Sequence, residues 1–355
     1  MSDLGISQVT AAHSWPLTQA SPLAGQASVS VELETVDCLL CGGSDHETIV
    51  ITHDRLTRIG GNFRVVRCRN CQLAFTNPRP TERDRGLFYP ADYAPHLKPA
   101  ASAGPLAGWR QKLEHAALRH RFGYPSARPD AATRLQSLVS RAVFRRRRDR
   151  QHWVPFRAPG RLLDFGCGAD DFLDQMRDYG WRVEGVDLFP QVVEAVRRKP
   201  GMRAHLGTLP HPDIKPGTFD AITMRHSLEH VPFPKVVLEA AADALRSGGV
   251  LVVGVPNFDS WSFQHFQQNW TGLALPRHLT HFTPATLCRM AEAVGFRTLA
   301  IEQIGRDGRI RKSARIAAAA GAPSLLRRKL PAGLVARWTE LTGRADSLRL
   351  IAEKI

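Results

Sequence analysis

The stretch Leu162-Leu163-Asp164-Phe165-Gly166-Cys167-Gly168 decides the fold class of this chain. An apolar run ends in an acid and two glycines, and a helical spacing of apolar residues begins directly after it. Glycine lets the backbone approach a ligand because it has no Cβ. The first turn of a helix offers unpaired N–H groups to that ligand. The stretch therefore predicts a strand, a tight turn and a helix that form a nucleotide site.

A second apolar run, from Trp181 to Val186, ends in Asp187, which lies 23 residues after Asp164. An acid at the end of a second strand suits hydrogen bonds to a ribose diol. The glycine order is Asp-x-Gly-x-Gly, whereas a dinucleotide site has G-x-G-x-x-G, and Asp171 would repel a pyrophosphate. We therefore expect an adenosine that carries a zwitterionic tail.

At these residues the chain resembles the class I S-adenosylmethionine-dependent methyltransferases, whose first motif is D/E-x-G-x-G-x-G; Asp170 replaces the third glycine. Four later segments resemble the family in order: 219–224, 227–231, 245–253 and 276–283. The resemblance covers about residues 158 to 304, resumes at the C-terminus, and is of the ubiquinone/menaquinone-methyltransferase type. It implies S-adenosyl-L-methionine as cofactor and an α/β, Rossmann-like seven-stranded sheet.

Apolar strands alternate with amphipathic helices over the same region, which predicts a parallel sheet with helices on both faces. The expected strands are 161–165, 181–187, 219–224, 249–255 and 296–304. The expected helices are 170–179, 189–198, 234–246 and 284–294. The alternating residues 347–354 would, by the resemblance, form the antiparallel strand that closes the sheet.

The predicted organisation has four parts: a disordered tail (1–36), a zinc-ribbon module (37–95), a helical connector (96–157) and the methyltransferase domain (158–355) with a basic helical insertion (305–345). The zinc-ribbon prediction rests on two CxxC pairs that 26 residues separate, Cys38/Cys41 and Cys68/Cys71. Four thiolates satisfy a tetrahedral zinc ion. A redox role is open to one CxxC pair, but two pairs favour a structural metal.

Ten residues are predicted to contact the cofactor: Asp164, Phe165, Gly166, Cys167, Gly168, Asp187, Leu188, Thr208, Leu209 and His226. Histidine titrates near neutral pH and suits removal of a proton. Three histidines on segments expected to border the pocket are therefore the catalytic candidates: His230, His278 and His281. Plain packing or turn geometry is the alternative for each residue. The aromatic stretch 258–270 is either a lid over the substrate or a helix packed on the core.

The 355 residues carry a net charge of +15 and no apolar run long enough for a membrane span. No basic region followed by an apolar stretch opens the chain, so we expect a cytoplasmic protein. The positive charge favours an anionic partner. Residues 309–330 are expected to contact the inner face of an anionic membrane, with Ile310, Ala314 and Ala317 on one helical face. The alternative is a solvated helical hairpin.

The sequence favours O- or C-methylation of a small or lipid-linked substrate, such as a sugar or a natural product. A tRNA or rRNA methyltransferase is the alternative, because a zinc ribbon and basic charge also suit RNA. Enzymes that methylate base nitrogens have N/D-P-P-Y/F after the fourth strand, where this chain has Arg225-His226-Ser227-Leu228. A non-catalytic scaffold is disfavoured by the intact Asp164, Gly166, Gly168 and Asp187.

Overall fold

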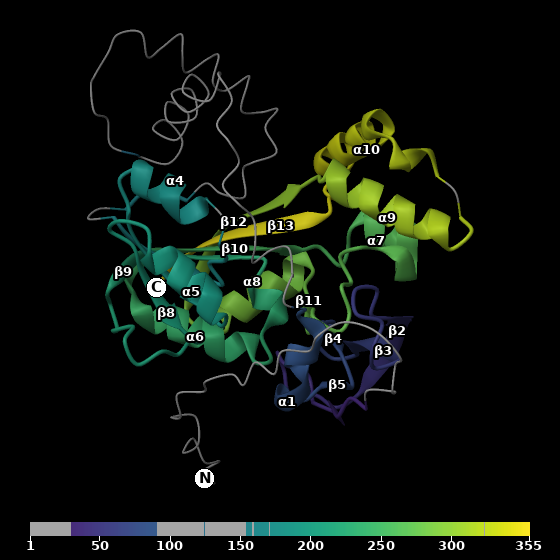
Figure 1. Cartoon of the computed structure of the whole chain (residues 1–355), viewed down its shortest axis with the longest axis horizontal. Coiled ribbons are helices and arrows are strands. Elements are labelled where there is room, and N and C mark those ends of the chain that lie inside the picture. The colour runs from purple at the N-terminus through teal and green to yellow at the C-terminus, as the bar shows by residue number, and fades with distance from the viewer. Residues whose placement is uncertain (1–29, 91–123, 125–153, 158–159, 170, 323) are drawn as a thin grey trace.

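A computed structural model describes residues 30–90, 124, 154–157, 160–169, 171–322 and 324–355. Most of the predicted tail (1–36) and connector (96–157) lies outside these residues. Figure 1 shows a central twisted sheet with helices on both sides and a smaller sheet beside it.

The central sheet has seven strands, as the sequence predicts. In chain order they are β6 (Arg161–Phe165), β7 (Arg182–Asp187), β8 (Arg203–Leu206), β9 (Phe219–Arg225), β10 (Leu245–Pro256), β12 (Phe296–Ile304) and β13 (Ser347–Lys354). Their order in space is β12-β13-β10-β9-β6-β7-β8. The pairs from β10 to β8 are parallel, and β13 is antiparallel to both of its neighbours. The predicted closing strand is confirmed as β13, whereas β8 was not predicted.

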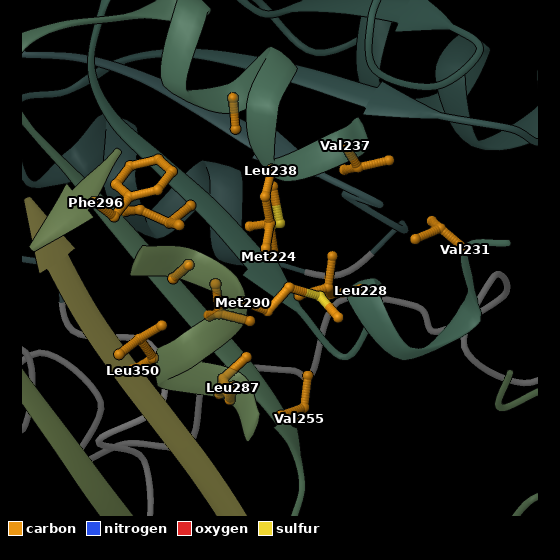
Figure 2. Close-up of a cluster of buried hydrophobic side chains, with 14 of the residues drawn as sticks. Met224, Leu228, Val231, Val237, Leu238, Val255, Leu287, Met290, Phe296 and Leu350 are labelled. Carbon is orange, nitrogen blue, oxygen red and sulfur yellow. The ribbon is translucent and has the colours of Figure 1, made fainter. Parts of the chain in front are cut away.

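Two hydrophobic layers hold the helices against the sheet. Adjacent strand residues point to opposite faces, and Leu162 and Leu163 accordingly join different buried clusters. The helices α4 (Phe172–Asp178) and α5 (Pro190–Arg197) cover one face, and α6 (Pro234–Ala244) and α8 (Pro284–Glu292) cover the other. Figure 2 shows the second layer, in which Leu238 of α6 and Met290 of α8 lie against sheet residues such as Met224.

The smaller sheet belongs mostly to the cysteine-bearing segment. It contains β2 (His46–His53), β3 (Asn62–Cys68), β4 (Ala74–Thr76) and β11 (Thr280–His281), in the order β11-β4-β3-β2. A strand pair, β1 (Leu33–Glu34) with β5 (Arg79–Pro80), lies nearby, followed by α1 (Glu82–Arg85) and η1 (Gly86–Phe88). Since β11 comes from the methyltransferase region, the two parts of the chain share one sheet.

The aromatic stretch forms a packed helix and not a lid. Helix α7 (Trp261–Phe266) is followed by η5 (Gln267–Asn269). Phe263 and Phe266 of α7, and Trp270 directly after η5, are buried in a cluster that also contains residues of β2 and β3. None of these three aromatic residues lines the cavity described below.

Two helices, α9 (Asp307–Ala319) and α10 (Lys329–Leu341), with η6 (Leu325–Arg327) before α10, form the insertion between β12 and β13. Ile310, Ala314 and Ala317 of α9 are buried in the same cluster as Phe263 and Trp270. The expectation that these three residues form an exposed membrane-contact face is therefore wrong, because they hold α9 on the core. A Cβ at Gly305 would lie 2.1 Å from the carbonyl oxygen of Ala336, so glycine permits the close approach of α10.

Candidate active site and cysteine cluster

A cavity of about 410 Å³ lies at the carboxyl ends of β6, β7 and β9, where open α/β sheets bind ligands. Ten of the thirteen predicted cofactor and catalytic residues line this cavity: Phe165, Gly166, Cys167, Gly168, Asp187, Leu188, Thr208, His226, His230 and His278. Asp164, Leu209 and His281 are buried and are not among its lining residues. The fold thus gathers most of the predicted site at one edge of the sheet.

The glycine turn after β6 has a left-handed backbone conformation that residues with a side chain adopt only with strain. Gly166 has φ of +68°, and a Cβ there would lie 2.5 Å from Cβ of Ser227. The turn is fixed to the next strand because the N–H groups of Gly166 and Cys167 both donate to the carbonyl of Val186. Close approach of a ligand to this backbone is the property that the sequence motif predicts.

Asp187 lies at the end of β7 and is held by backbone donors. Its carboxylate accepts hydrogen bonds from the N–H groups of Gly168 and Phe189, each at 3.0 Å. Burial raises the pKa of Asp187 above its ordinary value, because desolvation disfavours the charged form. The hydrogen bond from Gly168 thus connects the glycine turn to Asp187, the residue predicted to bind the ribose.

Asp164 supports the site from behind the cavity wall. Its Oδ1 accepts a hydrogen bond of 2.6 Å from the Thr223 hydroxyl, and its Oδ2 lies 3.5 Å from Nε of Arg225. The Arg225 guanidinium stacks over the ring of Phe172. This acid therefore fixes the ends of β6 and β9 relative to each other.

His226 follows β9 in a left-handed conformation, with φ of +58°. Such a conformation is uncommon outside glycine and often occurs at functional sites. Its N–H donates to the carbonyl of Gly254 at 2.7 Å, and its Nδ1 lies 3.2 Å from Oε1 of Glu229. Burial, together with nearby arginines, lowers the pKa of His226 well below its ordinary value, so the imidazole is neutral at pH 7.

Three ionisable side chains converge on the other side of the cavity. One ligand atom each of Glu229, His230 and His278 lies within 4.8 Å of the other two. Nδ1 of His278 lies 2.8 Å from the carbonyl of Gly272. A carbonyl only accepts, so Nδ1 carries the proton and Nε2 keeps its lone pair. Burial raises the pKa of Glu229 to about 8 and lowers that of His278 well below its usual range.

His230 is held by two partners at the same ring nitrogen. Its Nδ1 lies 3.1 Å from the carbonyl of Arg277 and 3.0 Å from the hydroxyl of Tyr89. The rings of His230 and His278 are edge to face, with centroids 4.7 Å apart. His230 comes from η4 (Leu228–His230) and His278 from the loop before β11, so two distant segments build one cluster.

His281 lies within β11 and not at the cavity surface. Its Nε2 is 3.2 Å from the hydroxyl of Thr76, and its ring packs beside Phe258. Burial lowers the pKa of His281 to about 3. Its ring centroid lies 6.4 Å from that of His278, but of the three catalytic candidates only His278 and His230 line the cavity.

Several residues that line the cavity were not predicted as site residues. They are Tyr89 and Phe88 from the cysteine-bearing part, Glu229 beside the predicted histidines, Arg277 and Arg309. Glu229 and Arg277 stand next to predicted residues, so their neighbourhood in sequence was a usable signal. Arg309 and Tyr89 reach the cavity only through tertiary packing, which no local pattern reveals.

The four cysteines predicted to bind metal come together. Sγ of Cys38 lies 3.3 Å from that of Cys71, and Sγ of Cys41 lies 3.6 Å from that of Cys68. Each CxxC segment forms a tight turn that is followed by a left-handed residue, Gly42 after Cys41 and Gln72 after Cys71. The four thiols lie close enough together to hold one metal ion.

Comparison with known proteins identifies the family. The family described as "Methyltransferase domain" matches residues 130–301. A ubiquinone biosynthesis O-methyltransferase of Thiobacillus denitrificans is 30% identical over 164 residues, which are 42% of this chain and 71% of that protein. The chain belongs to the S-adenosylmethionine-dependent methyltransferases. Its sheet order, with one antiparallel strand inserted next to an edge, is that of class I.

Other similarities are more limited. A ubiquinone biosynthesis O-methyltransferase of Idiomarina loihiensis is 31% identical over 156 residues, which are 40% of this chain and 63% of that protein. The chain thus spans less than two thirds of that relative. A solved S-adenosylmethionine-dependent methyltransferase of Mesorhizobium loti aligns at 17% identity with a TM-score of 0.41, over 56% of this chain and 94% of that one. Within the described ranges, no helix is long and apolar enough to cross a bilayer.

Proposed function

We propose that the protein transfers a methyl group from S-adenosylmethionine to a hydroxyl oxygen of a small acceptor. The observation that carries this proposal is a single cavity that joins the glycine turn and Asp187 to the cluster of Glu229, His230 and His278. Methyl transfer needs chiefly that nucleophile and methyl group are aligned. A shared cavity provides the space for that alignment, and a proton acceptor lies at its other side.

The residues at the sheet edge fit the cofactor. The Asp187 carboxylate suits a ribose diol, Leu188 and Thr208 border the adjacent cavity wall, and the Gly166 and Gly168 backbone permits close approach. His226, Phe165 and Cys167 line the same space, while Asp164 and Leu209 support it from behind. When bound, S-adenosylmethionine supplies a methyl group activated by the sulfonium.

In this proposal, the acceptor's proton passes to His230. The contact of its Nδ1 with the Arg277 carbonyl leaves Nε2 with a lone pair when Nδ1 is the donor. His278 and Glu229 lie close enough to orient the hydroxyl group. A positioned base of this kind contributes typically 10²- to 10⁴-fold to the rate.

The lining favours an aromatic or quinone-like acceptor. Much of the wall is apolar, with Phe88, Phe189, Val231 and Leu279 among the lining residues. A sugar would leave several hydroxyl groups without hydrogen-bond partners against these side chains, which is unfavourable. The relatives named above are O-methyltransferases of ubiquinone biosynthesis, which agrees with this class of acceptor.

Methyl transfer to a panel of acceptors tests the proposal. The full chain is incubated with S-adenosylmethionine labelled in the methyl group and with a catechol, a hexose, a nucleotide-linked sugar or bulk tRNA. We expect label on an oxygen of the catechol, identified by NMR of the product. Label on tRNA alone, or on carbon, would replace the proposed reaction with another methylation.

We also propose one structural zinc ion held by Cys38, Cys41, Cys68 and Cys71. Geometry supports it, because the four sulfurs all lie within 4.8 Å of one another, with Cys38 and Cys71 at 3.3 Å and Cys41 and Cys68 at 3.6 Å. Four protein ligands leave no open coordination position, which is the arrangement of a structural site. The ion would stabilise the small sheet that carries β11.

We propose that α10, in place of α9, makes peripheral contact with an anionic membrane. Figure 1 shows α10 outside α9, at the margin of the molecule. Leu330, Leu334 and Leu341 are 75%, 64% and 78% exposed, and their spacing puts them on one side of the helix. Arg328, Lys329 and Arg337 lie among them. An apolar face with basic neighbours suits the headgroup region of an anionic leaflet.

A further inference from the structure

Four arginines among the described residues line the cavity: Arg85, Arg225, Arg277 and Arg309. Nε of Arg225 lies 3.5 Å from Oδ2 of Asp164, and Nη1 of Arg277 lies 2.9 Å from Oδ1 of Asp54. The charges of Glu82 and Glu34 act on Arg85. Arg309 has no carboxylate within 4.0 Å in the described part of the chain. Arg309 is thus a cation that borders the cavity without a close protein anion.

One hydrogen-bond donor of Arg309 has no acceptor among the described residues. Its Nη2 lies 3.3 Å from both ring nitrogens of His226, whereas Nη1 is shielded from solvent and has no hydrogen-bond partner within the described residues. A buried donor without a partner is unfavourable. A ligand that supplies acceptor oxygens would satisfy Nη1.

The acids nearest in effect to Arg309 do not form an ion pair with it. Burial raises the pKa of Glu229 to about 8, so its carboxyl is mostly protonated at pH 7. Asp346 is the other acid whose charge acts on Arg309, and it is buried beside Trp270 with no Arg309 oxygen–nitrogen contact within 4.0 Å. Arg309 therefore borders the cavity as a cation without an ion-pair partner among the described residues.

Packing places Arg309 next to the cluster of Glu229, His230 and His278. It lies in the first turn of α9, which packs against α7 and η5 near the loop that carries His278. The Arg309 charge acts on Glu229, His226 and His278. Asp187, at the predicted ribose position, is held instead by backbone donors. Arg309 consequently lies where the cofactor side, through His226, meets the cluster of Glu229, His230 and His278.

We propose that Arg309 is the binding residue for a carboxylate on the methyl acceptor. The guanidinium offers a planar pair of donors that matches two carboxylate oxygens. This inference rests on the proposed function, because it assumes that the acceptor occupies the cavity beside His230. It narrows the acceptor class to hydroxylated aromatic acids.

The position of α9 explains how the chain supplies this residue. The Ser313 hydroxyl accepts a hydrogen bond of 3.0 Å from the N–H of Thr271, and Ile310 and Ala314 are buried below it. The Gly305 N–H donates to Oε1 of Glu340 on α10. The insertion between β12 and β13 thereby becomes a rigid wall of the site.

Equilibrium binding and turnover test the assignment together. The probes are 3,4-dihydroxybenzoate and catechol, which differ only by the carboxylate, titrated into the full chain saturated with S-adenosylhomocysteine. We expect Arg309→Met to weaken binding of 3,4-dihydroxybenzoate about 10- to 100-fold, as for loss of a charged hydrogen bond. Catechol binding should change less than about twofold. Arg309→Lys, which keeps the charge without the paired donors, should fall between.

Arg315→Met is the matched control, because Arg315 is exposed on the same helix. It should leave both probes at wild-type affinity. The inference is overturned if wild type does not prefer 3,4-dihydroxybenzoate over catechol, or if Arg309→Met weakens both probes equally.

A separate arm distinguishes the acceptor from the cofactor as the source of the carboxylate. S-adenosylhomocysteine and 5′-methylthioadenosine share the nucleoside, but only the first carries an amino-acid end. If Arg309→Met weakens the first and spares the second, Arg309 serves the cofactor and the acceptor assignment is wrong. If wild type binds neither nucleoside, the proposed function itself fails, independently of the benzoate result.

Discussion

The hydroxyl of Thr76 donates a hydrogen bond of 2.7 Å to the backbone carbonyl of His278. Thr76 ends a strand of the cysteine-bearing sheet, and His278 lines the cavity. The N–H of Thr76 also donates to the carbonyl of Leu279, so the loop is fixed at two points. The acceptor side of the cavity is therefore built on the small sheet, while the cofactor side is built on the large one.

This division predicts the effect of disrupting the cysteine cluster. Cys68→Ser should abolish turnover while the dissociation constant of S-adenosylhomocysteine changes only a few-fold, because the glycine turn and Asp187 belong to the other sheet. The Arg289 guanidinium donates to the carbonyl of Cys71, so a loosened module also loses a contact with α8. Turnover and calorimetry on one preparation measure both effects.

Cys288→Ser is the matched control, since Cys288 lies outside the cluster. It should keep turnover and about one equivalent of zinc by elemental analysis. Native protein that is folded, active and free of metal would refute the structural zinc. If Cys68→Ser lost cofactor binding as completely as it lost turnover, the division of the cavity between the two sheets would be refuted.

Substitution of His230 should lower turnover without weakening cofactor binding. His230→Ala is expected to reduce kcat by about 10²- to 10⁴-fold, and the dissociation constant of S-adenosylhomocysteine should stay near that of wild type. If His230→Ala keeps wild-type kcat, alignment alone carries the reaction and His230 has another role.

The pH profile identifies which member of the cluster acts as base. The pKa of Glu229 is about 8 in the folded protein, so a reaction that needs its carboxylate would rise with pH until about 8. Glu229→Gln would remove that limb of the kcat/KM profile. If the rise of kcat/KM with pH persists in Glu229→Gln and disappears in His230→Ala, His230 is the residue that accepts the proton, as proposed.

Buried histidine makes stability fall on acidification. The pKa of His281 is about 3 in the folded protein, against about 6.5 in an unfolded chain. Between these values the unfolded state binds more protons, so the free energy of unfolding rises with pH and is lost as pH falls below about 6.5. Replacing His281 should reduce this slope by about 1.4 kcal/mol per pH unit near pH 5.

Urea unfolding of His281→Gln from pH 4.5 to 7.5 measures that slope. His265→Gln is the control, because His265 stacks on Trp261 in α7 and belongs to no buried cluster. A slope in His281→Gln equal to that of wild type would show that the native state does not lower the pKa of His281.

Vesicle sedimentation tests the exposed face of α10. Wild type should pellet with phosphatidylglycerol vesicles at low salt and be released at high salt, since basic residues near an anionic leaflet contribute about 1 kcal/mol each. The triple variant Leu330→Ser, Leu334→Ser and Leu341→Ser should stay in the supernatant. A double variant of exposed residues elsewhere, Ile51→Ser with Leu299→Ser, should behave as wild type; if it also fails to pellet, the face is not specific.

Local patterns in the sequence predicted the parts of the site that local geometry determines. The glycine turn and Asp187 are examples, because an acid and two glycines after an apolar strand define a backbone path within a few residues. The pattern of residues 347–354 likewise predicted β13. Such features depend on neighbours in sequence, which one chain displays.

Long-range packing determined what the sequence could not show. His281 looks like its neighbour His278, yet pairing of β11 with β4 buries it. The spacing of Ile310 and Ala314 indicates an amphipathic helix but not whether its apolar face meets a membrane or α7. Arg309 reaches His226 across 83 residues of sequence, and only the packing of α9 on α7 and η5 brings them together.

Calorimetric titration of S-adenosylhomocysteine into wild type and Asp187→Ala examines whether this cavity binds an adenosine cofactor. We expect micromolar binding to wild type, on the order of −8 kcal/mol. Asp187→Ala should weaken this binding by about 1–3 kcal/mol, the usual loss for charged hydrogen bonds to a ribose. No heat of binding to wild type, or equal affinity in both proteins, would contradict the assignment of this cavity to an adenosine cofactor.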